Sequence, residues 1–188
     1  LKSPVKMMNW PEVQYMGVPH ISVPTTAGTG AEVTNGAVIY NKQLGIKHLI
    51  VSNYLESDIA VLDAHMTTGL PPMLTAATGM DALTHAIETM GHPNTSHFAL
   101  AHAETSAKII VENLPKVVAD GSDVLARQAM LSASAMACNS VVNDLGASPV
   151  HNFAHAFGAV CHIHHGEANG VLLPVVMEEF ADFYVPVV

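Results

Sequence analysis

Two pairs of side chains in this sequence are of types that bind divalent metals. Asp81 and His85 are four residues apart, so a helix would place both on one face, about 6 Å apart along its axis. His151 and His165 form the second pair. One carboxylate and three imidazoles are a sufficient protein ligand set for a metal that also needs an open position for substrate. If the four side chains converge in the fold, they form a catalytic metal centre.

Each pair also has an interpretation without a metal. Asp81 and His85 could share a hydrogen bond on an ordinary helix, and His165 could be a surface histidine beside a turn glycine. Both pairs, however, lie in stretches of apolar and small residues. Buried polar groups need partners, and one metal would supply a partner to all four. We therefore favour the metal centre.

The histidines around residue 151 allow one class of enzyme to be excluded. His151 and His155 have the four-residue spacing of the zinc-protease motif, but Asn152 stands where that motif has its glutamate base. The sequence is therefore not that of a zinc protease. His162 follows His151 by eleven residues, close to three helical turns, so it could share the same face.

A loop rich in threonine and glycine is the second polar segment of interest. Its glycines would let the backbone approach a ligand closely. Thr29 and Glu32 fit a capping box, which predicts a short helix whose first N–H groups are free for an anion. No third glycine completes a dinucleotide fingerprint, and a simple capped turn remains the alternative. The residues concerned are Thr25, Thr26, Gly28, Thr29 and Gly30.

Composition limits the class of protein. The 188 residues carry a formal net charge of −9 with scattered acidic residues, and no basic stripe is present to bind nucleic acid. No apolar run reaches the roughly 18 residues that span a membrane. Only Cys138 and Cys161 are cysteines, too few for a disulfide framework, and no signal peptide is recognisable. These features predict a cytoplasmic protein.

The pattern of elements changes near residue 69. Short apolar runs predict strands at 20–23, 37–40, 48–51 and 59–62. Helical spacing and cap residues predict helices at 75–90, 94–113, 122–145, 149–160 and 167–183, the last interrupted at Pro174. Ser96 or Thr95 is the expected cap of the second helix, and Ser122 that of the third. The fold class is thus α/β followed by all-α.

Three ordered motifs together resemble the iron-containing (group III) alcohol dehydrogenase family. They are the segments 24–34, 63–88 and 151–174. The resemblance implies a dehydroquinate synthase-like architecture of two domains, truncated here. Residues 1–69 would be the end of an α/β dinucleotide-binding domain, and residues 70–188 would be an incomplete helical metal-binding domain. The family's glycine-rich pyrophosphate turn and its last helices would lie outside this chain.

The resemblance also assigns roles to particular residues. The family's metal ligands correspond to Asp81, His85, His151 and His165, with His165 preferred to His164 because it directly precedes Gly166. His155 matches a histidine near the nicotinamide and could pass on a proton. The cofactor-binding positions correspond to Thr25, Thr26, Gly28, Thr29, Thr34 and Lys47. Glu88 returns to the face of Asp81, where it would be a helix-surface carboxylate or, alternatively, a support for the metal ligands.

The activity implied by the resemblance is hydride transfer between a primary or secondary alcohol and NAD or NADP, with Fe²⁺ as Lewis acid for the alcohol oxygen. Zn²⁺ suits the same ligands. Small alcohols and aldehydes are the expected substrates, and the full-length form is expected to be a homo-oligomer. Two alternatives remain: a polyol- or sugar-phosphate dehydrogenase or a lyase of the same fold, and a fragment that binds metal without turnover.

Overall fold

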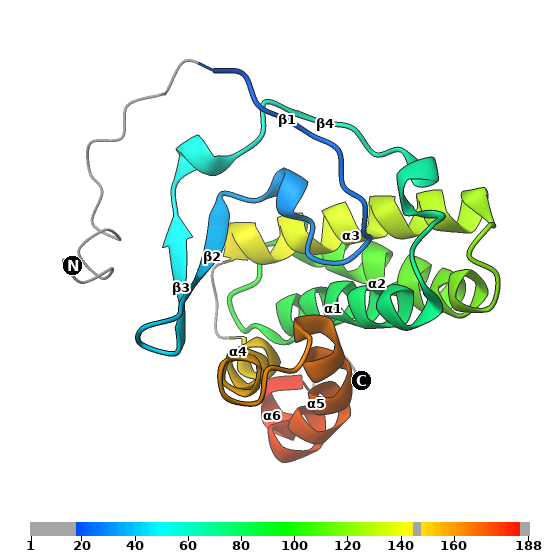
Figure 1. The fold of residues 1–188 in the computed structure, drawn as a ribbon. Coiled ribbons are helices and arrows are strands. Elements are labelled where there is room, and N and C mark those ends of the chain that lie inside the picture. Colours follow the sequence, from blue (N-terminus) through cyan, green and yellow to red (C-terminus); the bar gives the residue numbers. More distant parts are fainter. Residues whose placement is uncertain (1–17, 145–147, 185–188) are drawn as a thin grey trace.

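The computed structural model describes residues 18–144 and 148–184. Within these residues, the part before residue 72 carries short strands and the remainder is helical (Figure 1). The strands pair two by two: β1 (Ile21–Ser22) runs parallel to β4 (Ile59–Ala60), and β2 (Gly36–Asn41) runs antiparallel to β3 (Ile46–Val51). All four predicted strands are therefore confirmed. Two short 3₁₀ helices lie between strands, η2 (Ala31–Val33) and η3 (Asn53–Leu55), and a third, η4 (Ala64–Thr67), lies between β4 and the first α-helix.

A central helix organises the second part of the chain. The helices are α1 (Pro72–Gly91), α2 (His97–Ala119), α3 (Val124–Asp144), α4 (Pro149–Cys161), α5 (His165–Glu179) and α6 (Ala181–Tyr184). One side of α1 packs through Ala82 against Ile110 of α2 and Met130 of α3. Its other side packs through Ile87 against the cluster formed by α4, α5 and α6, and Met80 contacts both clusters. Figure 1 shows α4, α5 and α6 on one side of α1. The helix α1 thus lies between two apolar clusters.

The predicted end of the second helix at residue 113 is wrong, because α2 continues through Pro115. Proline removes one helical hydrogen bond and normally stops a helix. Here Leu114 and Val117, on either side of Pro115, are buried against α1 and α3. Pro115 itself is exposed. Burial of the two flanking side chains keeps the segment helical.

The interruption predicted at Pro174 is wrong for the same reason. Pro174 is exposed within α5, while Leu173 and Val176 are buried beside it. The helix starts at His165, two residues earlier than predicted, and ends before Phe180, which precedes α6. This earlier start makes His165 the first residue of a helix.

The caps differ in part from the prediction. Ser96 caps α2, since its side chain accepts a hydrogen bond from Ala99 N at 3.1 Å. Asp123, rather than Ser122, accepts from Ala126 N at the start of α3. Among the described helices, none is both long and apolar enough to cross a membrane. The change from strands to helices falls near residue 70, as predicted, while a domain boundary there stays a prediction.

Candidate metal centre

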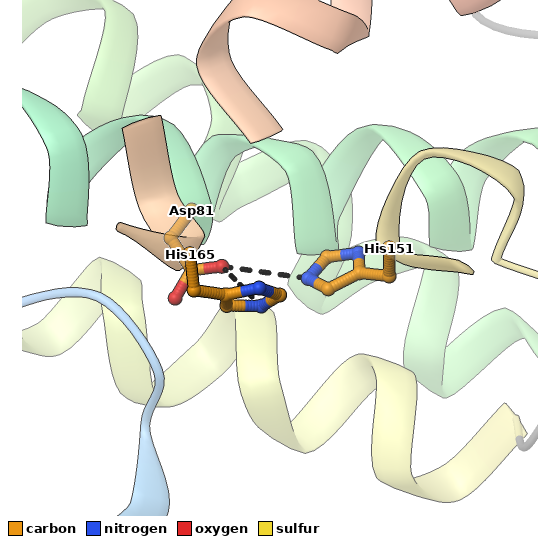
Figure 2. Close-up of side chains that lie close together, drawn as sticks. All are labelled: Asp81, His151 and His165. Atoms are coloured by element: carbon orange, nitrogen blue, oxygen red, sulfur yellow. Dashed lines mark ion pairs between the residues drawn. The ribbon is translucent and has the colours of Figure 1, made fainter. Parts of the chain in front are cut away.

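Three of the four predicted ligands converge. Asp81 comes from α1, His151 from the start of α4 and His165 from the start of α5, and their side chains point toward one another (Figure 2). The Asp81 Oδ1 atom lies 3.4 Å from His151 Nε2 and 3.5 Å from His165 Nε2. One ligand atom of each residue lies within 4.8 Å of the others. Asp81 and His151 are buried, and His165 is half-buried.

These separations suit a divalent cation. Tetrahedral sites with metal–ligand bonds of roughly 2.1 Å have ligand atoms about 3.4 Å apart. The distances from Asp81 to the two imidazoles match this value. Carboxylate and imidazole donors suit both Fe²⁺ and Zn²⁺. The residues present therefore fit the metal that the motifs imply.

His85 lies beside this group without belonging to it. Its ring stacks on the His151 ring, with centroids 4.4 Å apart and an angle of 16° between the planes. Its Nδ1 atom is buried and makes no hydrogen bond. Burial is the main cause that lowers the pKa of His85 to about 3, and the neighbouring His151 lowers this pKa further. His85 is thus a neutral imidazole next to the other ligands, and its role as a fourth ligand stays a prediction.

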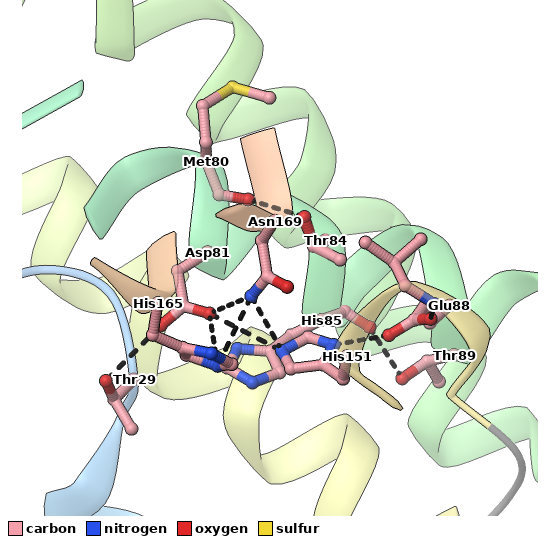
Figure 3. Close-up of polar contacts among 11 residues, drawn as sticks. Thr29, Met80, Asp81, Thr84, His85, Glu88, Thr89, His151, His165 and Asn169 are labelled. Carbon is pink, nitrogen blue, oxygen red and sulfur yellow. Dashed lines mark hydrogen bonds and ion pairs between the residues drawn. The ribbon is translucent and has the colours of Figure 1, made fainter. Parts of the chain in front are cut away.

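Glu88 supports His151, so its interpretation as a surface carboxylate is wrong. The side chain is only 2% exposed. Its Oε1 atom accepts from Val150 N at 2.6 Å, and its Oε2 atom lies in a short contact with His151 Nδ1 (Figure 3). A carboxylate that accepts the Nδ1–H of an imidazole fixes the tautomer that leaves Nε2 free for a metal. In this structure that Nε2 atom faces Asp81.

The charges of these groups are strongly coupled. Burial would raise the pKa of Asp81, but His85, His151 and His165 hold this pKa well below its usual range. Burial would likewise lower the pKa of His151, but Asp81 and Glu88 raise it to about 9. Asp81 is therefore a carboxylate at neutral pH. In the absence of a metal, His151 therefore holds a proton on both ring nitrogens at neutral pH, and a metal that binds its Nε2 atom would replace that proton. The Asp81 carboxylate attracts such a cation.

Asn169 is a polar residue of the site that the sequence analysis missed. It lies on α5, one turn after His165, and is fully buried. Its Nδ2 atom is 2.7 Å from Asp81 Oδ1, 3.2 Å from His151 Nε2 and 3.3 Å from His165 Nε2 (Figure 3). The four-residue spacing from His165 was the available signal, because it places both side chains on one helix face.

The threonine-rich loop contacts the centre through Thr29, whose hydroxyl donates to Asp81 Oδ2 at 3.3 Å (Figure 3). The predicted capping box is wrong. The helix η2 has only three residues, and its N-cap is Gly30 in the left-handed conformation, with no side-chain cap. A side chain at Gly30 would also collide with Cys138, at 2.2 Å. Glycine is needed there for backbone conformation and close packing.

Gly28 has a similar role. A Cβ atom added there would lie 2.7 Å from the Thr78 side chain and 2.8 Å from the Thr78 carbonyl oxygen. This glycine therefore lets the loop approach α1. Whether Gly28 also approaches a cofactor stays a prediction.

A cavity of about 500 Å³ reaches two of the predicted ligands, His85 and His151, whereas Asp81 and His165 are not among the residues that line it. The predicted residues Thr29, Thr34, His85, His151 and His155 line it, whereas Thr25, Thr26 and Gly28 do not. The His155 ring also stacks on the His165 ring, with centroids 4.8 Å apart. The side chain of Lys47 lies outside the described part of the structure. Apolar residues from the β2–β3 hairpin and α3 also line it: Val38, Val51, Val141 and Val142. The remaining lining residues are Asn35, Gly36, Cys138, Ser148 and Asn152.

The structure distinguishes the remaining histidines of this segment. The helix α4 ends at Cys161, and His162 follows in the left-handed conformation with φ 56°. His162 is exposed and does not share the face of His151, so that prediction is wrong. His164 is exposed as well, whereas His165 faces Asp81. This placement supports the preference for His165.

Comparison with known proteins agrees with these motifs. Residues 5–64 match the model of iron-containing alcohol dehydrogenases, and residues 75–184 match that of the C-terminal part of the Fe-containing alcohol dehydrogenase family. The probable alcohol dehydrogenase EutG of Salmonella typhimurium is 46% identical over 160 residues, which cover 85% of this chain and 40% of the relative.

Solved structures give the same result. A 1,3-propanediol oxidoreductase is 38% identical in sequence, with a TM-score of 0.81. The match covers 88% of this chain and 45% of the oxidoreductase chain. Sulfoacetaldehyde reductase from Bifidobacterium kashiwanohense, solved in complex with NAD⁺, is 31% identical in sequence, with a TM-score of 0.84. The match covers 95% of this chain and 48% of the reductase chain. The predicted fold class is thereby confirmed. The chain spans less than half of each of these relatives, and it belongs to the iron-containing alcohol dehydrogenase family.

Proposed function

We propose that the whole protein is a metal-dependent, NAD(P)-linked alcohol dehydrogenase or aldehyde reductase whose metal centre is carried by this chain. The observation that carries this proposal is the convergence of Asp81, His151 and His165. Of these three, His151 also lines a cavity, together with Thr29 and Thr34. The relatives in this family are named for alcohol and aldehyde oxidoreduction. A nicotinamide cofactor supplies or accepts the hydride in such reactions.

Residues of this chain would bind the metal, orient a ligand and transfer a proton. A divalent metal held by Asp81, His151 and His165 supplies a Lewis acid for the substrate oxygen. Glu88 holds His151 in the orientation in which Nε2 faces that position. His155 lines the cavity and stacks on His165, so it is placed to move a proton between substrate and solvent.

The cavity favours a small uncharged substrate. Four valines contribute to its wall, and none of the described residues that line it is a lysine or arginine. A phosphate or carboxylate group would require such cations as partners. We therefore rank a small alcohol or aldehyde above a polyol phosphate or sugar phosphate.

Metal identity requires a direct measurement. The ligand types suit Zn²⁺ as well as Fe²⁺, and the usual order of affinities favours zinc. Iron is proposed here because of the family to which the chain belongs. Elemental analysis of the full-length protein after anaerobic purification should find iron. If Zn²⁺, and not Fe²⁺, restores activity to the metal-stripped protein, the assignment of iron is contradicted.

Activity is best tested by NADH and NADPH oxidation with propanal and with a phosphorylated aldehyde. The full-length protein should reduce propanal after Fe²⁺ is added, and should reduce the phosphorylated compound much more slowly. Preference for the phosphorylated substrate would favour the alternative class. Full metal content without turnover of any aldehyde would indicate a metal-binding protein that is not an enzyme.

A further inference from the structure

Asn169 has an unusual set of neighbours for a buried amide. Its Nδ2 atom lies within 3.3 Å of one atom from each of Asp81, His151 and His165. Its Oδ1 atom is also buried and makes no hydrogen bond. Leaving a buried acceptor unpaired is costly, so the contacts of the Nδ2 atom must account for this orientation of the side chain.

The contact with Asp81 is the strongest of the three. At 2.7 Å it has the length of a charge-assisted hydrogen bond. Asp81 receives a second hydrogen bond from Thr29, at its other oxygen. The two donors approach from different parts of the chain, α5 and the threonine-rich loop, and together they fix the direction in which the carboxylate points (Figure 3).

The backbone around Asn169 keeps the amide in place. Asn169 follows His165 by one turn of α5, and Gly166 between them lies against the α1 backbone, where an added Cβ would be 2.2 Å from the Ala77 carbonyl oxygen. This close approach brings α5 to the helix that carries Asp81. Rotation of the amide is restricted because the side chain is fully buried.

We propose that Asn169 is a positioning residue for the metal centre. Its amide holds the Asp81 carboxylate toward His151 and His165, so that the three ligand atoms are already close together before a cation arrives. This inference rests on the proposed metal centre, and adds to it a residue outside the predicted ligand set. Loss of the amide donor would leave the ligands present and lower the affinity for the metal.

The test uses Co²⁺ as a spectroscopic probe in the full-length, metal-stripped protein. Asn169→Leu keeps a similar volume but removes the donor, and Asn169→Ser keeps a smaller donor. Asn113→Leu is the matched control, because the contacts of that amide lie within α2: its Nδ2 atom donates to the Ile109 carbonyl oxygen at 2.8 Å, and its Oδ1 atom accepts from Lys116 Nζ at 3.4 Å. Affinity is measured by competition with a chelator, and geometry by the visible absorption of bound Co²⁺.

Asn169→Leu should weaken Co²⁺ binding about tenfold to hundredfold and change the visible spectrum. Asn169→Ser should fall between this variant and the wild type, and Asn113→Leu should bind Co²⁺ normally. Unchanged or tighter binding by Asn169→Leu would overturn the inference, as would an equal loss in Asn113→Leu. If Asn169→Leu does not fold, unaltered affinity and spectrum in Asn169→Ser would overturn it. A wild-type protein that binds no Co²⁺ would instead contradict the proposed metal centre.

Discussion

The carboxylate of Glu88 makes two contacts with different consequences. It accepts a hydrogen bond from Val150 N near the start of α4, and it contacts His151 Nδ1. The first contact satisfies one of the free N–H groups at a helix start. The second orients a proposed metal ligand. A single buried side chain on α1 therefore contacts both the first turn of α4 and the histidine that this turn carries.

Glu88→Gln is expected to weaken metal binding about tenfold to hundredfold, because an amide is a weaker acceptor for the His151 Nδ1–H group. Chelator competition with the full-length protein measures the effect. Glu112→Gln is the control, since Glu112 is exposed on α2 and pairs with Lys116 at the surface. Equal metal affinity in Glu88→Gln and wild type would show that Glu88 does not orient the ligand.

Glu32 provides a pH-dependent prediction. This side chain is 6% exposed, and its Oε1 atom has no hydrogen-bond partner. Burial raises the pKa of Glu32 above its usual value. A carboxyl group whose pKa is higher in the folded state lowers stability as the pH rises, because the folded state then has to bury its charge. Below the unfolded-state pKa, both states hold the proton and the penalty disappears.

Glu32→Gln should therefore raise the free energy of unfolding near pH 7, and the gain should shrink toward about pH 4. Urea unfolding at several pH values measures this difference. The exposed Glu104 provides the control variant Glu104→Gln, which should show no such trend. A gain that grows as the pH falls would have the wrong sign and would contradict the burial argument.

At the scale of elements, the crossing of α5 over α1 assembles the site. Gly166 lies at this crossing, directly after His165, and a Cβ atom there would meet the Ala77 carbonyl oxygen at 2.2 Å. The obstacle is backbone, so it cannot move aside like a flexible side chain. Any larger residue at 166 must push the two helices apart. Such a shift would also move His165 away from Asp81.

Gly166→Ala is expected to destabilise the protein by about 1–3 kcal/mol through overpacking and to reduce metal affinity at the same time. Thermal unfolding and chelator competition give the two values. Gly69→Ala is the matched control, because nothing lies within 4 Å of a Cβ atom added at that position. Normal metal binding in Gly166→Ala would mean that this crossing does not position His165.

Secondary structure was predictable where one local rule decides it. The spacing of apolar residues located α1, α3 and α4 to within a few residues. The extents of α2 and α5 were not predictable from local rules, because Pro115 and Pro174 are strong local stop signals. Burial of the neighbouring side chains against other helices outweighs the lost hydrogen bonds, and such tertiary packing cannot be read from spacing.

At the scale of the whole molecule, the site combines segments that are far apart in the sequence. Asp81 and Asn169 are 88 residues apart and 2.7 Å from each other. Residue type and spacing indicated Asp81 and His85 as one pair and His151 and His165 as another, and the family motifs agreed with both pairs. Spacing could place Asn169 on the face of His165 and Glu88 on the face of Asp81, but the groups that these two side chains contact depend on how α1, α4 and α5 pack together.

The central claim is that Asp81, His151 and His165 hold a catalytic divalent metal, and metal content together with alcohol oxidation tests it most directly. Both should be measured in the full-length protein for wild type, His151→Ala and the exposed control His97→Ala. We expect about one metal ion per chain in wild type and control, and loss of both metal and activity in His151→Ala. Full metal content with full alcohol oxidation in His151→Ala would contradict the account.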